Sequence, residues 1–167
     1  MHSLLKWGLL TIFIITPESH LFAHSHMHHS TEETKFYLSS DIIQKVSVTY
    51  IEKIEPIFKA KCFDCHSTQT KYPWYHAIPG IRQFIDGDVK DGLGHIDFTP
   101  GYPFRTKHSP LEILTGIKKI AIKNSMPPIE YKIMHWKSSL TKKEREKILE
   151  WVNSSRRLIE KQTTKEK

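Results

Sequence analysis

Cysteine is scarce in this chain, with two residues among 167, and that scarcity excludes a small domain built on disulfide bonds. Long apolar runs are absent too, since the longest, Leu4–Ile15, is shorter than the about 20 residues that cross a bilayer comfortably. No internal repeat is visible, and no segment alternates polar and apolar residues for long enough to predict a sheet. The length and these absences favour one helical domain of ordinary size.

Acidic residues are the minority among the charged side chains. Eighteen Asp and Glu oppose 25 Lys and Arg, which gives a formal net charge of +7 at pH 7. With 38% hydrophobic and 26% charged residues, the composition is that of a folded protein. A basic surface suits an anionic partner, either an acidic protein or an anionic membrane bound peripherally. Nucleic acid is not an expected partner, because the basic residues follow no recognised nucleic-acid-binding module.

The first 23 residues have the features of a secretory signal peptide. Lys6 supplies a positive charge, Pro17 ends the apolar run, and Ala23 offers a small residue at a cleavage point. An uncleaved membrane anchor and a buried helix are the alternatives. The segment predicts a periplasmic or otherwise exported protein.

Histidines are concentrated directly after this segment, in His24–His29. Clustered imidazoles can bind a transition metal, but no cysteine or carboxylate stands at a fixed spacing to complete a site. Residues 24–45 are therefore predicted to be a flexible histidine-rich linker. A domain at 46–160 and a charged tail at 161–167 follow.

About four helices joined by long loops are predicted within the domain. Apolar residues spaced three or four apart indicate helices at Ile51–Ala60, where Pro56 marks a helix start or a kink, and at Ile78–Leu93. The segment 46–50 is ambiguous and is compatible with extended structure. Two more helices are predicted to start at the capping boxes Ser109–Glu112 and Thr141–Glu144.

Both cysteines belong to one motif, Cys62–His66, which matches the C-x-x-C-H attachment motif of c-type haem. One helical turn places both thiols on the same side, where they can add to the two vinyl groups of a porphyrin. His66 then lies beneath the iron as the proximal ligand. We therefore expect Cys62 and Cys65 to form thioethers with one covalent haem c.

Three other interpretations of the cysteine pair are weaker. A zinc site needs further Cys or His at ligand spacing, and the chain has no second cysteine pair. A thiol oxidoreductase expects strands around the pair, whereas here the pair follows a predicted helix. A structural disulfide is the third alternative.

The sixth iron ligand is predicted to be Met126, which precedes two prolines on the loop after the third helix. A methionine thioether is a soft ligand that favours reduced iron, and the prolines stiffen the loop that must hold it. The rival ligands are Met134, His95 and His135, and an open distal position is a further alternative.

Aromatic residues near the motif are candidates for the wall of the haem pocket. Trp74 and Tyr75 can cover a porphyrin or hydrogen-bond its propionates, although ordinary core packing is an equal alternative. Pro79 is placed to offer its carbonyl to the second ring nitrogen of His66.

The order of these motifs resembles the bacterial haem-binding domain family, a monohaem cytochrome c-like group. The resemblance extends from about Tyr50 to Leu158. Its most specific blocks are Pro73–Tyr75 and Met126–Tyr131, the latter reading Met-Pro-Pro-x-x-Tyr. The resemblance implies an all-α, cytochrome c-like domain wrapped around one covalent haem, with His66 proximal and Met126 distal.

The function predicted from the sequence is one-electron transfer by an exported c-type cytochrome with no catalytic residues. Lysines around the motif and around Met126 suit docking to an acidic redox partner. A haem-based enzyme or sensor is the first alternative, in which peroxide or a gas binds at an open or labile distal position. A metal-handling protein that uses the histidine-rich segment is the second. The lysines in question are Lys53, Lys59, Lys61, Lys71, Lys118, Lys119, Lys123, Lys132 and Lys137.

Overall fold

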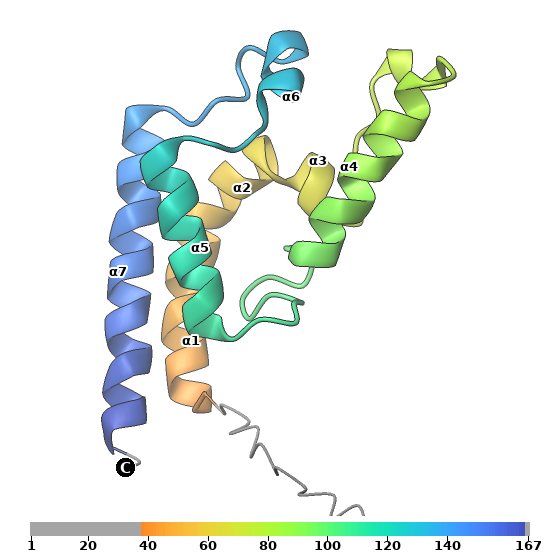
Figure 1. The fold of residues 1–167 in the computed structure, drawn as a ribbon. Helices are drawn as coiled ribbons and strands as arrows, with labels where there is room; N and C mark the ends of the chain where they lie inside the picture. Colours follow the sequence, from red (N-terminus) through yellow and green to blue (C-terminus); the bar gives the residue numbers. More distant parts are fainter. Residues whose placement is uncertain (1–37, 166–167) are drawn as a thin grey trace, which may run out of the picture. The chain divides into compact units, whose positions relative to one another are not determined.

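The structure is a computed structural model, and it describes residues 38–165. The predicted signal peptide and the histidine-rich cluster lie outside the described residues. The described part is helical, which confirms the predicted all-α class (Figure 1). Its elements are α1 Ser40–Thr49, the π-helical turn η1 Tyr50–Ile54, α2 Glu55–Lys61, α3 Phe63–His66, the 3-10 turn η2 Trp74–Ala77, α4 Ile81–His95, α5 Pro110–Lys123, α6 Ile129–Met134 and α7 Lys142–Lys165.

The first three elements form one uninterrupted helical stretch, from Ser40 to Lys61. Val46, Tyr50 and Ile54 are spaced four apart and are fully or almost fully buried, so they form one apolar stripe. The extended alternative for 46–50 is therefore wrong, and helix begins within the segment predicted as a linker. Pro56 lies in the first turn of α2, directly after the π-helical turn η1, where the hydrogen-bond register of the helical stretch changes.

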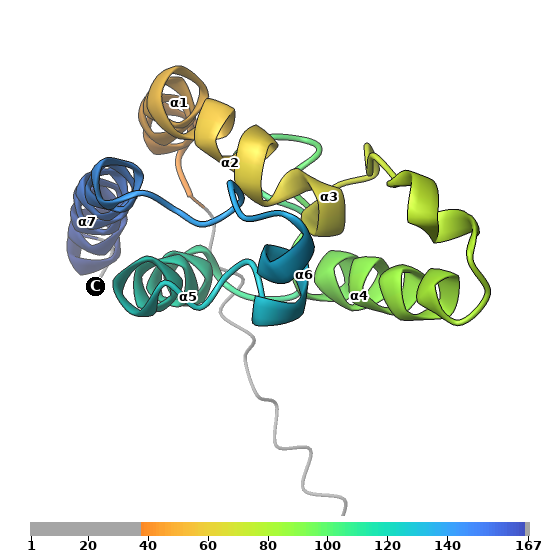
Figure 2. The same cartoon turned by 90° about the horizontal axis from the view of Figure 1, so that it is seen from above.

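Helices α5 and α7 pack side by side and run antiparallel (Figures 1 and 2). Both predicted capping boxes are present. Glu112 N donates to Ser109 Oγ and Ser109 N to Glu112 Oε2, at 3.3 and 2.8 Å, and the pair Thr141 and Glu144 repeats the arrangement. α5 ends as predicted at Asn124, which adopts a left-handed conformation with φ 51°.

The sequence predicts that the domain ends at 160 and that a charged tail follows at 161–167. The boundary at 160 is wrong, because α7 continues through Lys165. The physical reason is the apolar stripe of α7, which does not end at Val152. Ile159 is fully buried, and Ser155 is almost so. Burial of Ile159 stabilises α7 past the point at which its sequence becomes strongly charged.

In Figure 2, η2 and α4 extend away from α5 and α7, and α6 lies between α5 and α4. They contribute little to the core: α4 buries only Val89 and Gly92, and neither η2 nor α6 buries any residue. The chain between α4 and α5 is a loop, as the sequence indicates, with one bridge between Asp97 and Arg105. Among the described helices, none has the length and apolar character of a membrane span.

Candidate functional site

The cysteine motif forms one tight turn at the junction of α2 and α3. Cys62 ends α2, and its carbonyl accepts hydrogen bonds from the backbone N–H of Cys65 at 3.2 Å and of His66 at 2.9 Å. Both cysteines are free and partly buried. Burial raises the pKa of the Cys62 thiol to about 12 and also raises the pKa of Cys65, so both are protonated at neutral pH.

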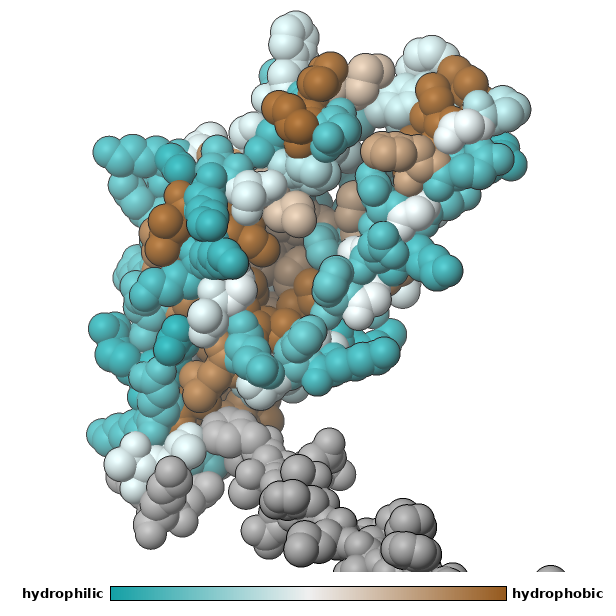
Figure 3. Space-filling view, in the orientation of Figure 1, coloured by the Kyte–Doolittle hydropathy of each residue, from teal (hydrophilic) through white to brown (hydrophobic). Residues whose placement is uncertain are grey.

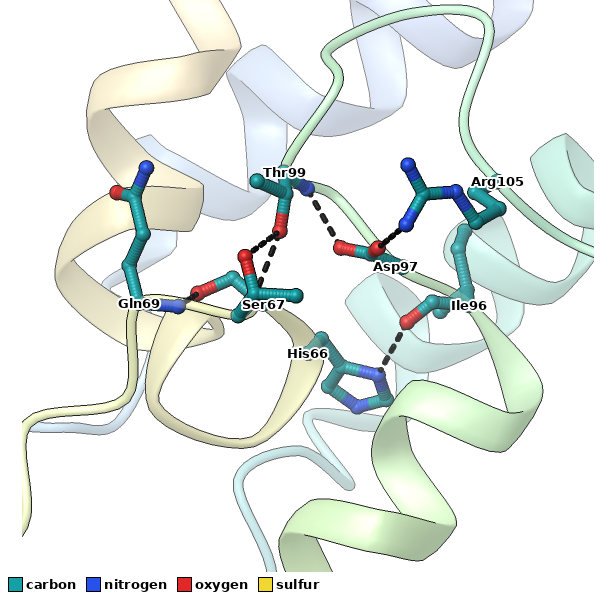
Figure 4. Close-up of polar contacts among 8 residues, drawn as sticks. His66, Ser67, Gln69, Ile96, Asp97, Thr99 and Arg105 are labelled. Atoms are coloured by element: carbon teal, nitrogen blue, oxygen red, sulfur yellow. Dashed lines mark hydrogen bonds and ion pairs between the residues drawn. The ribbon is translucent and has the colours of Figure 1, made fainter.

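His66 is oriented by backbone carbonyls at the end of α4. Its Nδ1 lies 3.0 Å from the Gly92 carbonyl oxygen and 3.2 Å from that of Ile96. Figure 4 shows the contact with Ile96. Because a carbonyl only accepts, Nδ1 carries the proton and donates, which leaves a lone pair on Nε2. Burial lowers the pKa of His66 and favours this neutral form. The arrangement is the one required of a histidine that ligates a metal through Nε2.

The structure therefore corrects the role predicted for Pro79. Pro79 is exposed and lies before α4, whereas the two carbonyls that face Nδ1 belong to Gly92, in the last turn of that helix, and to Ile96, directly after it. The Gly92 carbonyl also accepts from Ile96 N at 3.0 Å, so the end of α4 and the residue that caps it present both carbonyls to the histidine. Sequence spacing gave no sign of this, because α4 separates Pro79 from its C-terminal end.

Gly92 allows α4 to approach the motif closely. A Cβ atom at this position would lie 2.3 Å from the Cys65 carbonyl oxygen, closer than real Cβ contacts come. The glycine is thus required by the contact between α3 and α4, and that contact brings the Gly92 carbonyl to His66. The sequence shows Gly92 and Gly94 alike, and only packing distinguishes them, since nothing lies within 4 Å of a Cβ at Gly94.

Polar residues of the loop after α4 form hydrogen bonds next to the cysteine motif (Figure 4). Asp97 is almost fully buried, and its two carboxylate oxygens accept from Thr99 N at 2.8 Å and from the Arg105 guanidinium at 2.9 Å. Thr99 Oγ1 in turn accepts from Thr68 N at 2.9 Å, and Phe98 N donates to the His66 carbonyl at 2.8 Å. These bonds fix the chain at His66 and directly after it.

The motif opens onto an apolar cavity of about 420 Å³. Both cysteines and His66 line one side, and Met126, Pro127 and Pro128 line it from the loop after α5. Apolar residues of α2, the loop and α5 complete the wall, among them Phe58, Phe98, Ile113, Ile117 and Ala121. The cavity thus combines two thiols, an imidazole with a free lone pair and a thioether within a largely apolar lining.

This donor set fits a haem. Thiols match porphyrin vinyl groups, imidazole and thioether match iron, and the apolar wall matches the macrocycle. Within residues 38–165, no group of three or more His, Cys, Asp or Glu side chains is arranged to hold a bare metal ion. The fit is therefore to a cofactor that brings its own equatorial ligands.

The rival distal ligands are placed differently from one another. His95 lines the same cavity as Met126, whereas Met134 and His135 line a second cavity of about 340 Å³. His135 also uses both ring nitrogens, with Nδ1 3.1 Å from the Tyr131 carbonyl oxygen and Nε2 3.2 Å from the Tyr75 hydroxyl. The structure thus brings Met126 and His95, but neither Met134 nor His135, into the cavity that His66 lines.

Trp74 and Tyr75 also line the second cavity and do not line the first, and Pro79 lines neither. Trp74 is 82% exposed, so it is not an ordinary core residue. Three residues line both cavities: Asp64, Cys65 and Tyr131. Of these, Cys65 is a predicted site residue, whereas Asp64 and Tyr131 are not among the candidates predicted from the sequence. Two features of the sequence could have indicated these residues. Tyr131 belongs to the Met-Pro-Pro-x-x-Tyr block, and Asp64 lies inside the cysteine motif.

Comparison with known proteins agrees with this donor set. Residues 19–154 match the family described as haem-binding domain. The chain belongs to the haem-binding domain family. Membership makes this a haem-binding protein, as the cavity and its donors indicate.

One curated relative is similar to this haem-binding protein. Cytochrome c peroxidase Ccp of Escherichia coli (strain K12) is 27% identical over 117 residues, which cover 68% of this chain and 25% of that protein. The chain therefore spans about a quarter of the length of that relative. No solved structure matches the chain.

Proposed function

We propose that this protein is an exported c-type cytochrome that transfers single electrons. Cys62 and Cys65 would hold one haem through thioethers, His66 would ligate the iron from one side, and Met126 would ligate it from the other. The bound haem supplies one-electron chemistry at its iron. The observation that carries the proposal is the convergence of these four side chains on one cavity.

The protein's own groups are arranged for a fixed coordination state. The carbonyls of Gly92 and Ile96 hold the His66 proton on Nδ1, so that the ring does not turn and Nε2 stays unprotonated. Apolar residues of α5 limit water in the cavity. With His66 and Met126 both held at the iron, little would rearrange when an electron arrives, and such rigidity would favour transfer over substrate binding.

The partner is proposed to be an acidic redox protein. Lys61 lines the cavity, Lys119 and Lys123 are exposed on α5, and Lys137 is exposed in the chain after α6. Positive charge around the cavity steers an acidic protein to this face, so the association rate should fall as salt rises. We also propose export to the periplasm, because c-type haem is the cofactor that the motif predicts and the first 23 residues predict secretion.

A haem-based peroxide or gas reaction is the second candidate. The side chain of Met126 is 39% exposed, so a small ligand has a route to displace it. Similarity to a protein named cytochrome c peroxidase is compatible with this candidate. The two candidates differ in whether the distal ligand stays bound.

Replacement of the distal methionine separates them. Met126→Ala should lower the midpoint potential and allow the ferrous protein to bind carbon monoxide, because a soft axial ligand has been removed. Met134→Ala is the matched control, since Met134 lines only the second cavity. If the unaltered protein binds carbon monoxide rapidly and stoichiometrically, the peroxide or gas candidate replaces the carrier.

A further inference from the structure

The segment that includes Met126 has little packing of its own to hold it in place. Helix α6 starts two residues after Pro127 and buries none of its six residues. Ile129 and Ile133 are 63% and 72% exposed, so apolar burial does not fix the helix. Pro127 is buried at the cavity wall, directly after Met126. Side-chain hydrogen bonds must therefore position α6.

The loop before α6 is closed on itself. Lys132 Nζ donates to the carbonyl oxygen of Asn124 at 3.0 Å, which ties the first residue after α5 to the middle of α6. Met126 lies inside this closed loop, five residues before Tyr131. Tyr131 and Met126 thus belong to one short segment that this bond closes.

Tyr131 attaches this loop to the cysteine motif. Its hydroxyl donates to Asp64 Oδ2 at 2.7 Å, and Asp64 lies between the two cysteines. Asp64 Oδ1 is 3.4 Å from Lys71 N, so the carboxylate also faces the chain that follows the motif. Burial, together with the adjacent carboxylate, raises the pKa of Tyr131 and keeps its hydroxyl a donor. One short bond thus links the helix of His66 to the loop of Met126.

A second contact supports Tyr131 from the outside. The His135 ring stacks on the Tyr131 ring, with centroids 4.1 Å apart and planes 16° apart, and Tyr75 donates to His135 Nε2. Farther along the chain, Lys61 donates to the Lys137 carbonyl. These contacts hold the C-terminal end of α6, whereas the Asp64–Tyr131 bond holds the end nearest Met126.

We propose that the Asp64–Tyr131 hydrogen bond is a latch that keeps the Met126 segment closed over the haem cavity. The inference rests on the proposed function, in which Met126 is the distal ligand. Asp64 and Tyr131 line both cavities, so they form part of the wall between them. Opening the latch loosens Met126 and joins the cavities, which admits small ligands to the iron. Asp64 and Tyr131 are positioning residues, because neither needs to touch the iron.

The test is imidazole binding to the ferric haem-loaded protein, followed by absorbance. Tyr131→Phe removes the hydroxyl but keeps the ring, and imidazole affinity should rise about tenfold or more, equivalent to about 1.4 kcal/mol. Hydrogen exchange over residues 125–136 should accelerate in the same variant. Tyr102→Phe is the matched control, because the Tyr102 hydroxyl is buried without a hydrogen-bond partner in the described structure.

Variants of Asp64 give the conservative rescue. Asp64→Asn keeps an acceptor oxygen and should change imidazole affinity less than Asp64→Ala does. Unchanged imidazole affinity and exchange in Tyr131→Phe, in a protein whose spectrum shows a methionine ligand, would overturn the latch alone. If the unaltered protein binds imidazole as tightly as Met126→Ala, Met126 is not the ligand, and both the latch and the proposed distal ligation fail.

Discussion

The two sides of this molecule differ in how they are held together. Helices α1, α2, α5 and α7 with the turn η1 form a packed half, in which Tyr50, Leu114, Trp151 and Val152 are fully or almost fully buried. The elements η2, α4 and α6 form a sparse half that buries only Val89 and Gly92. Figure 3 shows hydrophobic surface over α6 and over the neighbouring end of α4.

The cavity lies where the two halves meet, and that placement explains its character. Side chains from α5 and α7 supply an apolar wall, and the cysteine motif and the loop after α5 supply the donors. The sparse half supplies the Gly92 carbonyl that orients His66 and, in Tyr131, one partner of the proposed latch beside Met126. A haem attached at the junction would contact both halves and so stabilise the one that lacks a core.

The two halves should differ most in how much free energy of unfolding is lost when a tryptophan is replaced by alanine. Trp151 is 2% exposed and packs against the rings of Tyr50, Phe58, Tyr102 and Phe104. Trp151→Ala should lower the free energy of unfolding by about 3–5 kcal/mol. Trp136 is 88% exposed, and Trp136→Ala should change it by less than about 0.5 kcal/mol. Urea unfolding measures both, and equal losses would contradict the division into halves.

The cysteine thiols offer a second comparison of the two halves. Cys62 lies at the end of α2, in the packed half, whereas Cys65 also lines the second cavity. Burial raises the pKa of Cys62 to about 12, so little thiolate exists at pH 8. In protein made without haem attachment, iodoacetamide should modify Cys62 roughly a hundredfold more slowly than in urea. Peptide mass spectrometry over time gives the two rates. Equal rates with and without urea would show that the packed half needs haem to fold.

Substitution of two glycines in α4 tests the contact between α3 and α4. Gly92→Ala places a methyl group against the Cys65 carbonyl and should destabilise the protein by about 1–3 kcal/mol. Gly94→Ala meets no atom and should stabilise α4 by about 0.4–1 kcal/mol. Thermal unfolding in both variants measures the difference, and haem content in Gly92→Ala should fall with it. A Gly92→Ala protein as stable as Gly94→Ala would show that α3 and α4 are not in close contact.

The smallest effect is expected in the capping box of α5. Hydrogen bonds from the Ser109 backbone and side chain lower the pKa of Glu112 from its usual 4.5. A depressed folded-state pKa means that this stabilisation is complete above pH 4.5 and is lost as pH falls through the folded value. The stability difference between the unaltered protein and Glu112→Gln should therefore shrink from pH 6 to pH 3. In a Ser109→Ala background the same comparison should show a smaller pH dependence, because the side-chain hydrogen bond is lost while the bond from the backbone N–H at position 109 remains.

The sequence predicted the packed half better than the sparse half, for a physical reason. The helices α2, α5 and α7 have apolar stripes that face a core, and α5 and α7 also begin with capping boxes, so periodicity and capping residues indicate them correctly. The apolar residues Ile78, Ile81 and Phe84 of the predicted 78–93 helix are exposed and line the second cavity instead. α6, with six residues and no buried side chain, has too little pattern to predict.

Within the site, residue identity could be predicted and contacts could not. The spacing of Cys62, Cys65 and His66 indicated the donors, and the Met-Pro-Pro block indicated Met126. The carbonyl of Gly92 and the Asp64–Tyr131 bond join residues 26 and 67 positions apart. No local pattern encodes such pairs, because the fold alone brings them together.

Covalent attachment of haem is the claim on which the account depends. The direct measurement is mass spectrometry of the exported protein made in a host with the c-type cytochrome maturation machinery, intact and after tryptic digestion. The account predicts one haem on the peptide that contains Cys62–His66, and no haem on a Cys62→Ser, Cys65→Ser double variant. A peptide with two free thiols in protein that still binds haem would contradict it.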